Sequence, residues 1–223
     1  MKRGFLAILP LALGVATYGF AFGILAAEAG FSPLGIAAMA AAVFAGSSQI
    51  AAVDQFLSTG AVFGAALAGA ALNLRYIGIV ASVTPILREM PWRSRLLAMQ
   101  FATDENFGLT LAARARDPSI GGRFLLGTGL TLLAFWGAST VLGAVVGQAL
   151  PDLERFGIGF AFTAAFIAIA RALWPGPAAL LPWLAAFCIT ILLIKFGLPT
   201  AVGLVLGALG GVAVDFLVNR DER

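Results

Sequence analysis

Long apolar runs, separated by short polar junctions, dominate the chain. Several junctions carry turn-forming residues, among them Pro91, Pro151 and Pro199. A run of roughly 17 to 25 apolar residues is long enough to cross a bilayer as a helix. The pattern predicts eight hydrophobic segments, at 5–27, 34–57, 60–86, 96–113, 122–149, 156–172, 177–194 and 198–218. We therefore expect an all-α, polytopic helical membrane protein with one transmembrane domain over residues 1–223.

Composition supports the membrane class. The chain is 61% hydrophobic and 11% charged, whereas soluble domains carry about 25% charged residues. The net charge is only +3, and the basic residues lie between apolar runs, so we expect no nucleic-acid partner. The first run, 5–27, exceeds the roughly 7 to 15 residues of a signal-peptide core. We interpret it as a retained transmembrane helix.

The residue inventory argues against an enzyme. The chain has no histidine, which excludes histidine-based triads and zinc-protease motifs. Its single cysteine, Cys188, lies within an apolar run, as expected of a small buried hydrophobic residue. Neither a phosphate-binding loop, a Gly-x-Ser-x-Gly elbow nor a metal-ligand cluster is present. We expect no enzymatic activity, no cofactor and no metal.

Polar residues interrupt the second segment. Ser47, Ser48 and Gln49 follow Gly46 in the middle of 34–57. One interpretation is a hydrogen-bonding site between helices. The other is a helix break, because glycine weakens a helix and serine side chains compete for its backbone groups. Free amides at the start of a half-helix would then suit a carboxylate.

Arg75 and Asn73 lie within the third segment. Arg75 is roughly ten residues from Arg88, which is about 15 Å of helix and too far for easy contact with the membrane surface. Arg75 therefore needs an anion. That anion is either the partner in a structural ion pair or a substrate carboxylate, with Asp104 or Glu105 available as a proton-linked alternative.

Asp104, Glu105 and Asn106 lie in the centre of segment 96–113. An acid at the centre of a transmembrane helix costs roughly 2.5 to 3.5 kcal/mol, so two adjacent acids predict a specific role. Basic residues flank this segment at both ends, which is unusual for a crossing helix. The flanking residues are Arg93, Arg95, Arg114 and Arg116.

Charge distribution favours a topology with two re-entrant hairpins. If all eight segments cross, the basic residues outside the cell are Arg88, Arg93, Arg95, Arg155 and Lys195. If 34–57 and 96–113 turn back at Gly-Ser-Ser-Gln and Thr-Asp-Glu-Asn, only Arg155 and Lys195 stay outside. The second topology agrees better with the positive-inside rule. It places both termini in the cytoplasm and both polar tips near the midplane.

These polar residues together suit a zwitterion with an apolar side chain. Arg75, or the amides at Ser47 and Ser48, would hold a carboxylate, and Asp104 or Glu105 an ammonium group. The remaining acid is available to carry a proton, since burial favours the protonated form of a carboxyl group. An ion or small-solute channel and a purely structural membrane subunit stay open as alternatives.

Five stretches resemble the AzlC family, the large subunits of bacterial branched-chain amino acid exporters. They are FAFGILAAEAG at 20–30, VFAGSSQIAA at 43–52, LNLRYIGIVASVTPILR at 72–88, FATDENFGL at 101–109 and FTAAFIAIA at 162–170. The resemblance implies export of leucine, isoleucine or valine, driven by an ion gradient. It also implies a cytoplasmic (inner) membrane location and a small AzlD-type membrane partner. From the intramembrane polar residues we predict a substrate site that includes Ser47, Ser48, Gln49, Asn73, Arg75, Asp104, Glu105 and Asn106.

Overall fold

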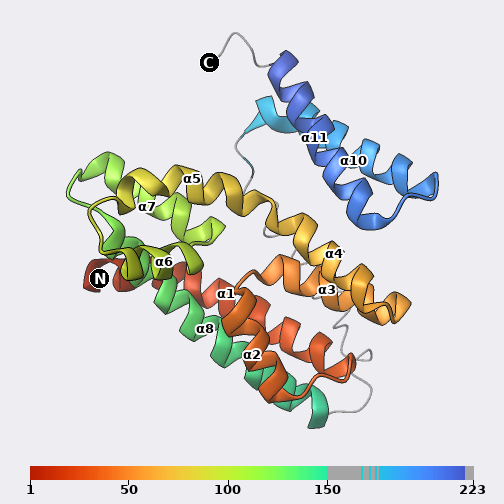
Figure 1. Ribbon diagram of the computed structural model, residues 1–223, viewed down its shortest axis with the longest axis horizontal. Helices are drawn as coiled ribbons and strands as arrows, with labels where there is room; N and C mark the ends of the chain where they lie inside the picture. The colour runs from red at the N-terminus through yellow and green to blue at the C-terminus, as the bar shows by residue number, and fades with distance from the viewer. Residues whose placement is uncertain (150–166, 168–170, 172–173, 175, 219–223) are drawn as a thin grey trace.

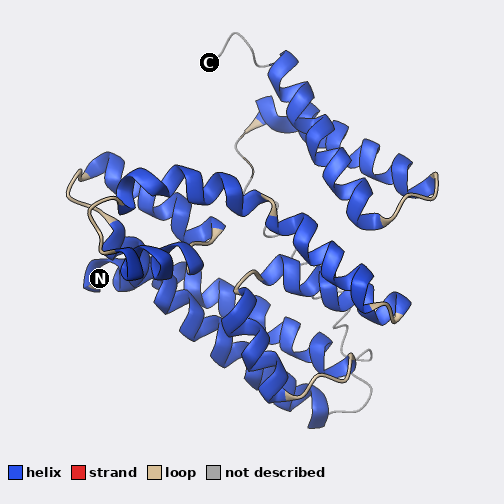
Figure 2. Ribbon diagram, viewed as in Figure 1, coloured by secondary structure: helices blue, strands red, loops and turns tan. Residues whose placement is uncertain are grey.

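The computed structural model describes residues 1–149, 167, 171, 174 and 176–218. All regular elements in this part of the chain are helices (Figure 2). Four are long and apolar enough to cross a membrane: Lys2–Glu28, Val62–Leu87, Gly122–Ala149 and Pro177–Lys195. The predicted all-α membrane fold is confirmed. The predicted segment 156–172 lies almost entirely outside the described residues.

The two longest helices form the frame of the molecule. Helix α1 (Lys2–Glu28) and helix α8 (Gly122–Ala149) run side by side in the same direction (Figure 1). Glycines permit their close approach, because a Cβ on Gly23 would meet the backbone of Thr140 and one on Gly143 the backbone of Phe20. The small-residue pairs of the sequence thus bring these two helices into backbone contact.

Segment 34–57 is broken into two short helices. Helix α2 (Pro33–Val43) begins with a Ser32 cap, whose Oγ accepts a hydrogen bond from Gly35 N at 3.1 Å. Helix α3 (Gly46–Thr59) follows after Phe44 and Ala45, and Phe44 has φ 22°, a strained value for a bulky residue. The break lies just before Gly-Ser-Ser-Gln, which forms the first turn of α3 rather than the bend itself.

The two ends of this first hairpin lie together. The rings of Phe31, before α2, and Phe56, near the end of α3, have centroids 6.3 Å apart. Gln148, near the end of α8, donates a hydrogen bond to Phe31 O at 3.5 Å. The hairpin therefore enters and leaves at the end of the molecule where α1 and α8 finish, as a re-entrant segment.

Helices α4 (Val62–Asn73) and α5 (Arg75–Leu87) follow one another across the molecule (Figure 1). Helix α4 packs against α3, where Gly69 allows close approach to the backbone of Ser48. The sequence predicted one segment over 60–86, and the structure confirms one candidate membrane span over Val62–Leu87. The helical hydrogen-bonding pattern is interrupted within it at Leu74, directly beside Arg75, although Leu74 keeps helical backbone angles.

Segment 96–113 forms the second hairpin. Helix α6 (Trp92–Gln100) and helix α7 (Asp104–Arg116) are joined by Phe101, Ala102 and Thr103. The bend again precedes the polar motif, so that Asp104, Glu105 and Asn106 form the first turn of α7. The Thr103 hydroxyl and the Asn106 side chain form a capping box.

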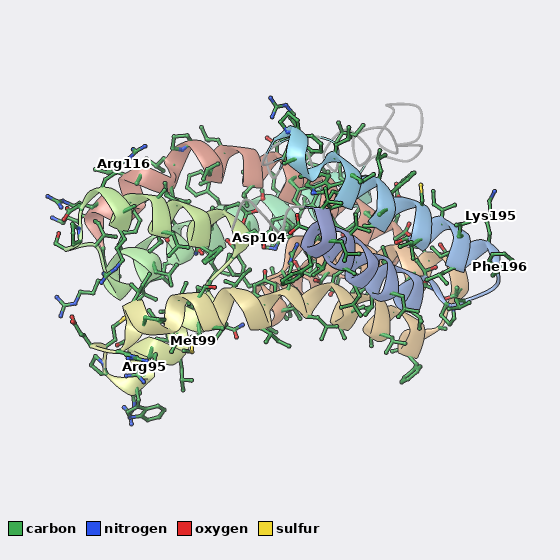
Figure 3. All side chains as sticks on the ribbon, turned by 90° about the horizontal axis from the view of Figure 1, so that it is seen from above. Arg95, Met99, Asp104, Arg116, Lys195 and Phe196 are labelled. Carbon is green, nitrogen blue, oxygen red and sulfur yellow. The ribbon has the colours of Figure 1, made fainter. Side chains whose placement is uncertain are left out.

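This second hairpin begins and ends where α1 begins. Arg3 Nη1 lies 3.2 Å from Asp117 Oδ2, just after α7, and Gly122 lies against Met90, just before α6. Hydrogen bonds from Ser119 lower the pKa of Asp117 at this exposed end. Figure 3 shows Arg95 and Arg116 at one end of the molecule and Lys195 at the other, with Asp104 between them. The two hairpins thus enter from opposite ends, as predicted.

The order of elements has inverted symmetry. Helix α1 crosses and the first hairpin turns back from its far end; α4 and α5 return and the second hairpin turns back from the opposite end (Figure 1). Inverted repeats of this kind are typical of secondary transporters, whose sites lie where broken helices meet.

The last helices form a separate pair. A short 3₁₀ helix η2 (Pro177–Ala179) leads into α10 (Leu180–Lys195), which packs against α11 (Thr200–Val218). Gly203, Gly207 and Gly211 of α11 face α10, near Ile194, Thr190 and Ala186.

We predict that Gly143→Ala destabilises the protein by about 1 to 3 kcal/mol, because the added methyl would meet the backbone of Phe20 on α1. Gly137→Ala on the same helix is the control, since a Cβ there meets nothing within 4 Å. Thermal denaturation in detergent measures both. Equal melting temperatures for the two variants would contradict the observed α1–α8 contact.

Topology is open to a thiol-labelling test in a Cys188→Ser background. We expect cysteines at Ser94, beside α6, and Ser58, near the end of α3, to react with a membrane-impermeant reagent from opposite faces. Labelling of Ser58→Cys alone in intact cells would also place the N-terminus inside. Reaction of both positions from one face would rule out the pair of opposed hairpins.

Candidate functional site

The tips of the two hairpins meet inside the molecule. The rings of Phe44 and Phe101 lie edge to face with centroids 6.0 Å apart. Gln100 donates a hydrogen bond from Nε2 to Ala42 O at 3.1 Å, which links α6 to α2. Tyr76 Oη lies 3.5 Å from Phe44 O and connects α5 to the same place. Three interrupted segments therefore come together at one point.

Arg75 lies at this point and binds both tips. Its Nη1 is 3.0 Å from Asp104 Oδ2 on α7, and its Nη2 donates a hydrogen bond to Ser47 Oγ on α3 at 2.7 Å. The guanidinium also lies 5.4 Å from the ring centroid of Tyr76. The side chains of Arg75 and Asp104 are 35% and 25% exposed, so neither end of the ion pair is sealed.

A small pocket of about 60 Å³ lies around this ion pair. One wall is polar and is formed by the hairpin tips and α5; the other is apolar and is formed by α1 and α8. The polar wall contains Ser47, Arg75, Tyr76, Thr103, Asp104 and Glu105. The apolar wall contains Val15, Tyr18, Leu132 and Trp136, with Phe44 and Gly46 at the first hairpin.

The two half-helices differ at their starts. Helix α7 is capped by its own residues, since Thr103 Oγ1 accepts a hydrogen bond from Asn106 N at 3.5 Å and Asn106 Oδ1 accepts one from Thr103 N at 2.8 Å. Helix α3 begins at Ala45 with no side-chain cap. Because uncapped amides and the helix dipole favour an anion, the start of α3 beside Arg75 suits a carboxylate.

Four of the eight predicted site residues line the pocket: Ser47, Arg75, Asp104 and Glu105. The other four lie in its supporting structure. Ser48 donates a hydrogen bond to Asn73 Oδ1 at 2.6 Å, and Asn106 Nδ2 donates one to Phe101 O at 2.6 Å. Gln49 Nε2 donates to Met39 O at 2.9 Å. Direct contact of substrate with any of the eight stays a prediction.

Sequence reasoning missed the aromatic lining of the pocket. Tyr18 and Trp136 each lie in a helix that is long and apolar enough to cross the membrane, so they look like ordinary packing residues in the sequence. The available signal was that both carry a polar group at mid-helix, which must find a partner in the protein. Trp136 Nε1 donates to Gln49 Oε1 at 3.1 Å.

The arrangement suits charge recognition rather than bond-breaking chemistry. The pocket lining contains one guanidinium and two carboxyl groups, so its net charge is −1 when all three are ionised. An ammonium group or a proton balances it. Within the described part of the chain, no cluster of three histidine, cysteine or acidic residues is arranged to hold a metal ion.

Comparison with known proteins agrees with this architecture. The chain is 26% identical over 223 residues to the inner membrane protein YgaZ of Escherichia coli, covering 93% of this chain and 88% of the relative. It is 28% identical over 149 residues to an uncharacterized membrane protein of Archaeoglobus fulgidus, covering 67% of this chain and 64% of that relative, somewhat under two thirds. No solved structure matches. The sequence model of the AzlC protein family matches residues 10–150, and the chain belongs to that family.

Proposed function

We propose that the chain is the permease subunit of a secondary transporter that exports branched-chain and related apolar amino acids. It acts in the bacterial cytoplasmic membrane with a small AzlD-type subunit. The observation that carries the proposal is the position of Arg75 between Ser47 and Asp104, one on each hairpin tip. Because one cation holds both tips together, a ligand whose own charges bind to that cation changes the contact between the tips.

The two walls of the pocket match the two parts of such a substrate. The carboxylate lies between Arg75 and the uncapped start of α3, and the ammonium group lies against Asp104 or Glu105. The hydrocarbon side chain lies against the apolar wall of α1 and α8. Asp104 and the substrate carboxylate then exchange places as partners of Arg75, so the ion pair opens when substrate binds.

The size of the pocket favours a carrier over a channel. About 60 Å³ is far below the roughly 300 Å³ at which ligand pockets begin, so the hairpin tips must separate before an amino acid enters. Opposed hairpins that meet at a midplane site allow this opening from one end at a time. A channel requires a continuous path, which the contact of Phe44 with Phe101 interrupts here.

Proton coupling follows from the excess of acid over base. A proton and a substrate ammonium group compete for the carboxylates of Asp104 and Glu105, because each binds to the same carboxylate oxygens. Competition of this kind produces exchange. A site without substrate carries a proton into the cell, and the deprotonated site then carries an amino acid out. Inward proton flow then drives export.

The orientation comes from the distribution of basic residues. Arg95 and Arg116 lie at the same end of the molecule as the start of α1, and Lys195 lies at the other (Figure 3). By the positive-inside rule the first end faces the cytoplasm, together with both termini. Exposed apolar side chains such as Phe63, Ile77 and Leu217 then face lipid or the small subunit.

We predict that Arg75→Gln and Asp104→Asn each lower export of valine at least about tenfold. Each change removes one charge of the pair that the substrate engages, and tenfold corresponds to about 1.4 kcal/mol. Efflux from cells preloaded with labelled valine measures the effect, with the small subunit coexpressed. Asp54→Asn on the exposed face of α3 is the matched control and retains full activity. Full activity in both site variants would refute the proposed mechanism.

A counterflow experiment separates the carrier from a channel. In proteoliposomes containing both subunits, unlabelled valine inside should accelerate uptake of labelled valine from outside. The physical reason is that a carrier returns faster with its site occupied than empty. Uptake that is indifferent to internal valine would favour the channel instead.

A further inference from the structure

The apolar wall of the pocket is built around one large side chain. Trp136 on α8 is only 2% exposed, and its indole lines the pocket opposite Arg75, Asp104 and Glu105. Val15 and Leu132 lie on the same wall but are smaller. The indole, with the ring of Tyr18 5.6 Å from it between centroids, therefore forms the large aromatic part of this wall.

Contacts from two other helices, α1 and α3, hold this indole in place. Its Nε1 donates to Gln49 Oε1 on α3, and its ring stacks on Phe22 of α1 with centroids 5.6 Å apart and planes 14° apart. Gln49 is itself held by a hydrogen bond from Nε2 to Met39 O of α2, at 2.9 Å. A ring bound by a hydrogen bond at its edge and by stacking on its face has little freedom to turn away.

Gly46 completes the arrangement at the first hairpin tip. A Cβ at this position would lie 2.8 Å from Trp136 Cη2 and 3.1 Å from Tyr18 Cε1, closer than side chains tolerate. The first residue of α3 is thus small where the indole reaches the half-helix start. The ring edge therefore reaches the first residue of α3, at the half-helix start assigned to the substrate carboxylate.

We propose that Trp136 determines the size of substrate side chain the transporter accepts, with Gln49 as the positioning residue that fixes the indole. This rests on the proposed function, whose charged wall holds the ammonium and carboxylate groups. With both groups held there, the side chain points to the opposite wall and ends against the indole. A fixed ring at that depth admits a short branched side chain and excludes an aromatic one.

Replacement of the indole by a smaller ring tests this assignment. In the counterflow assay, Trp136→Phe should raise the ratio of phenylalanine to valine transport at least about tenfold, since one methylene in an apolar pocket already changes discrimination by roughly 10- to 200-fold. Leu142→Ala on the same helix is the control, because Leu142 is exposed and does not line the pocket. It should leave the ratio unchanged.

Gln49 has a separate readout. Gln49→Leu removes the acceptor of the indole N–H and should broaden selectivity toward larger side chains while transport of valine continues. Gln49→Glu keeps an oxygen acceptor for the indole N–H but can donate to Met39 O only when protonated, so it should keep the wild-type ratio only in its protonated form. An unchanged ratio in Gln49→Leu would show that the hydrogen bond does not position the ring.

Tryptophan fluorescence tests whether the substrate binds beside Trp136 without a substitution at that residue. In a chain that retains Trp136, with Trp92, Trp174 and Trp183 replaced by phenylalanine, valine should change the emission. A second chain that retains only Trp183 should show no change. No change at Trp136, or an equal change at both positions, would overturn the proposal even if Trp136→Phe fails to fold.

The outcomes distinguish a failure of the role of Trp136 from a failure of the proposed transport function. If the wild-type chain with its small subunit shows no valine counterflow, the proposed function fails. If the wild type transports valine and Trp136→Phe keeps the wild-type ratio, only the role of Trp136 fails.

Discussion

The ion pair between Arg75 and Asp104 is the constraint on which the rest of the structure depends. An isolated charge at membrane depth is expensive, so an arginine within a membrane-spanning segment requires an anion, and here the anion comes from the second hairpin. The same guanidinium also binds Ser47 on the first hairpin. One side chain at the interruption of α4 and α5 thus joins both hairpin tips. Separation of the tips requires a new partner for it.

Broken helices and close packing are complementary features of this fold. Backbone groups at Phe44 and Phe101 leave the helical pattern at a depth where no bulk water reaches them, which is tolerated only where protein or a polar cavity surrounds them. The glycine contacts between α1 and α8 supply a rigid frame beside the hairpins. The closely packed pair α1 and α8 thus lies on one side of the site, and the two opposed hairpins meet on the other.

Much of the fold could be predicted from local pattern. Apolar run lengths predicted the spanning helices, and basic flanks on both sides of 96–113 predicted that this segment turns back. The exact bends differ by a few residues, at Phe44 and Phe101, because Gly46 to Gln49 and Asp104 to Asn106 stabilise helix starts rather than turns. The interruption at Leu74 escaped prediction, since neither glycine nor proline marks it.

The charged residues of the site could be predicted from the sequence, but the apolar residues that line the pocket could not. The free-energy cost of a polar group in the membrane identified Arg75, Asp104, Glu105 and the serines. Such groups stand out in an apolar run whatever the tertiary structure is. The pairing of Arg75 with Asp104 rather than Glu105 depends on the angle at which α7 meets α5.

Sequence alone determined the membrane class and the charged residues, since each depends on spacing within one segment, and it favoured two hairpins over eight crossing segments. Only the tertiary structure decided that Gln49 accepts a hydrogen bond from Trp136, that Ser48 donates one to Asn73, and that an indole from α8 lines the same pocket as the ion pair. Helical periodicity sets which neighbours share a face within an element. Contacts between residues as distant as Gln49 and Trp136 are set by how whole helices pack, which no local pattern encodes.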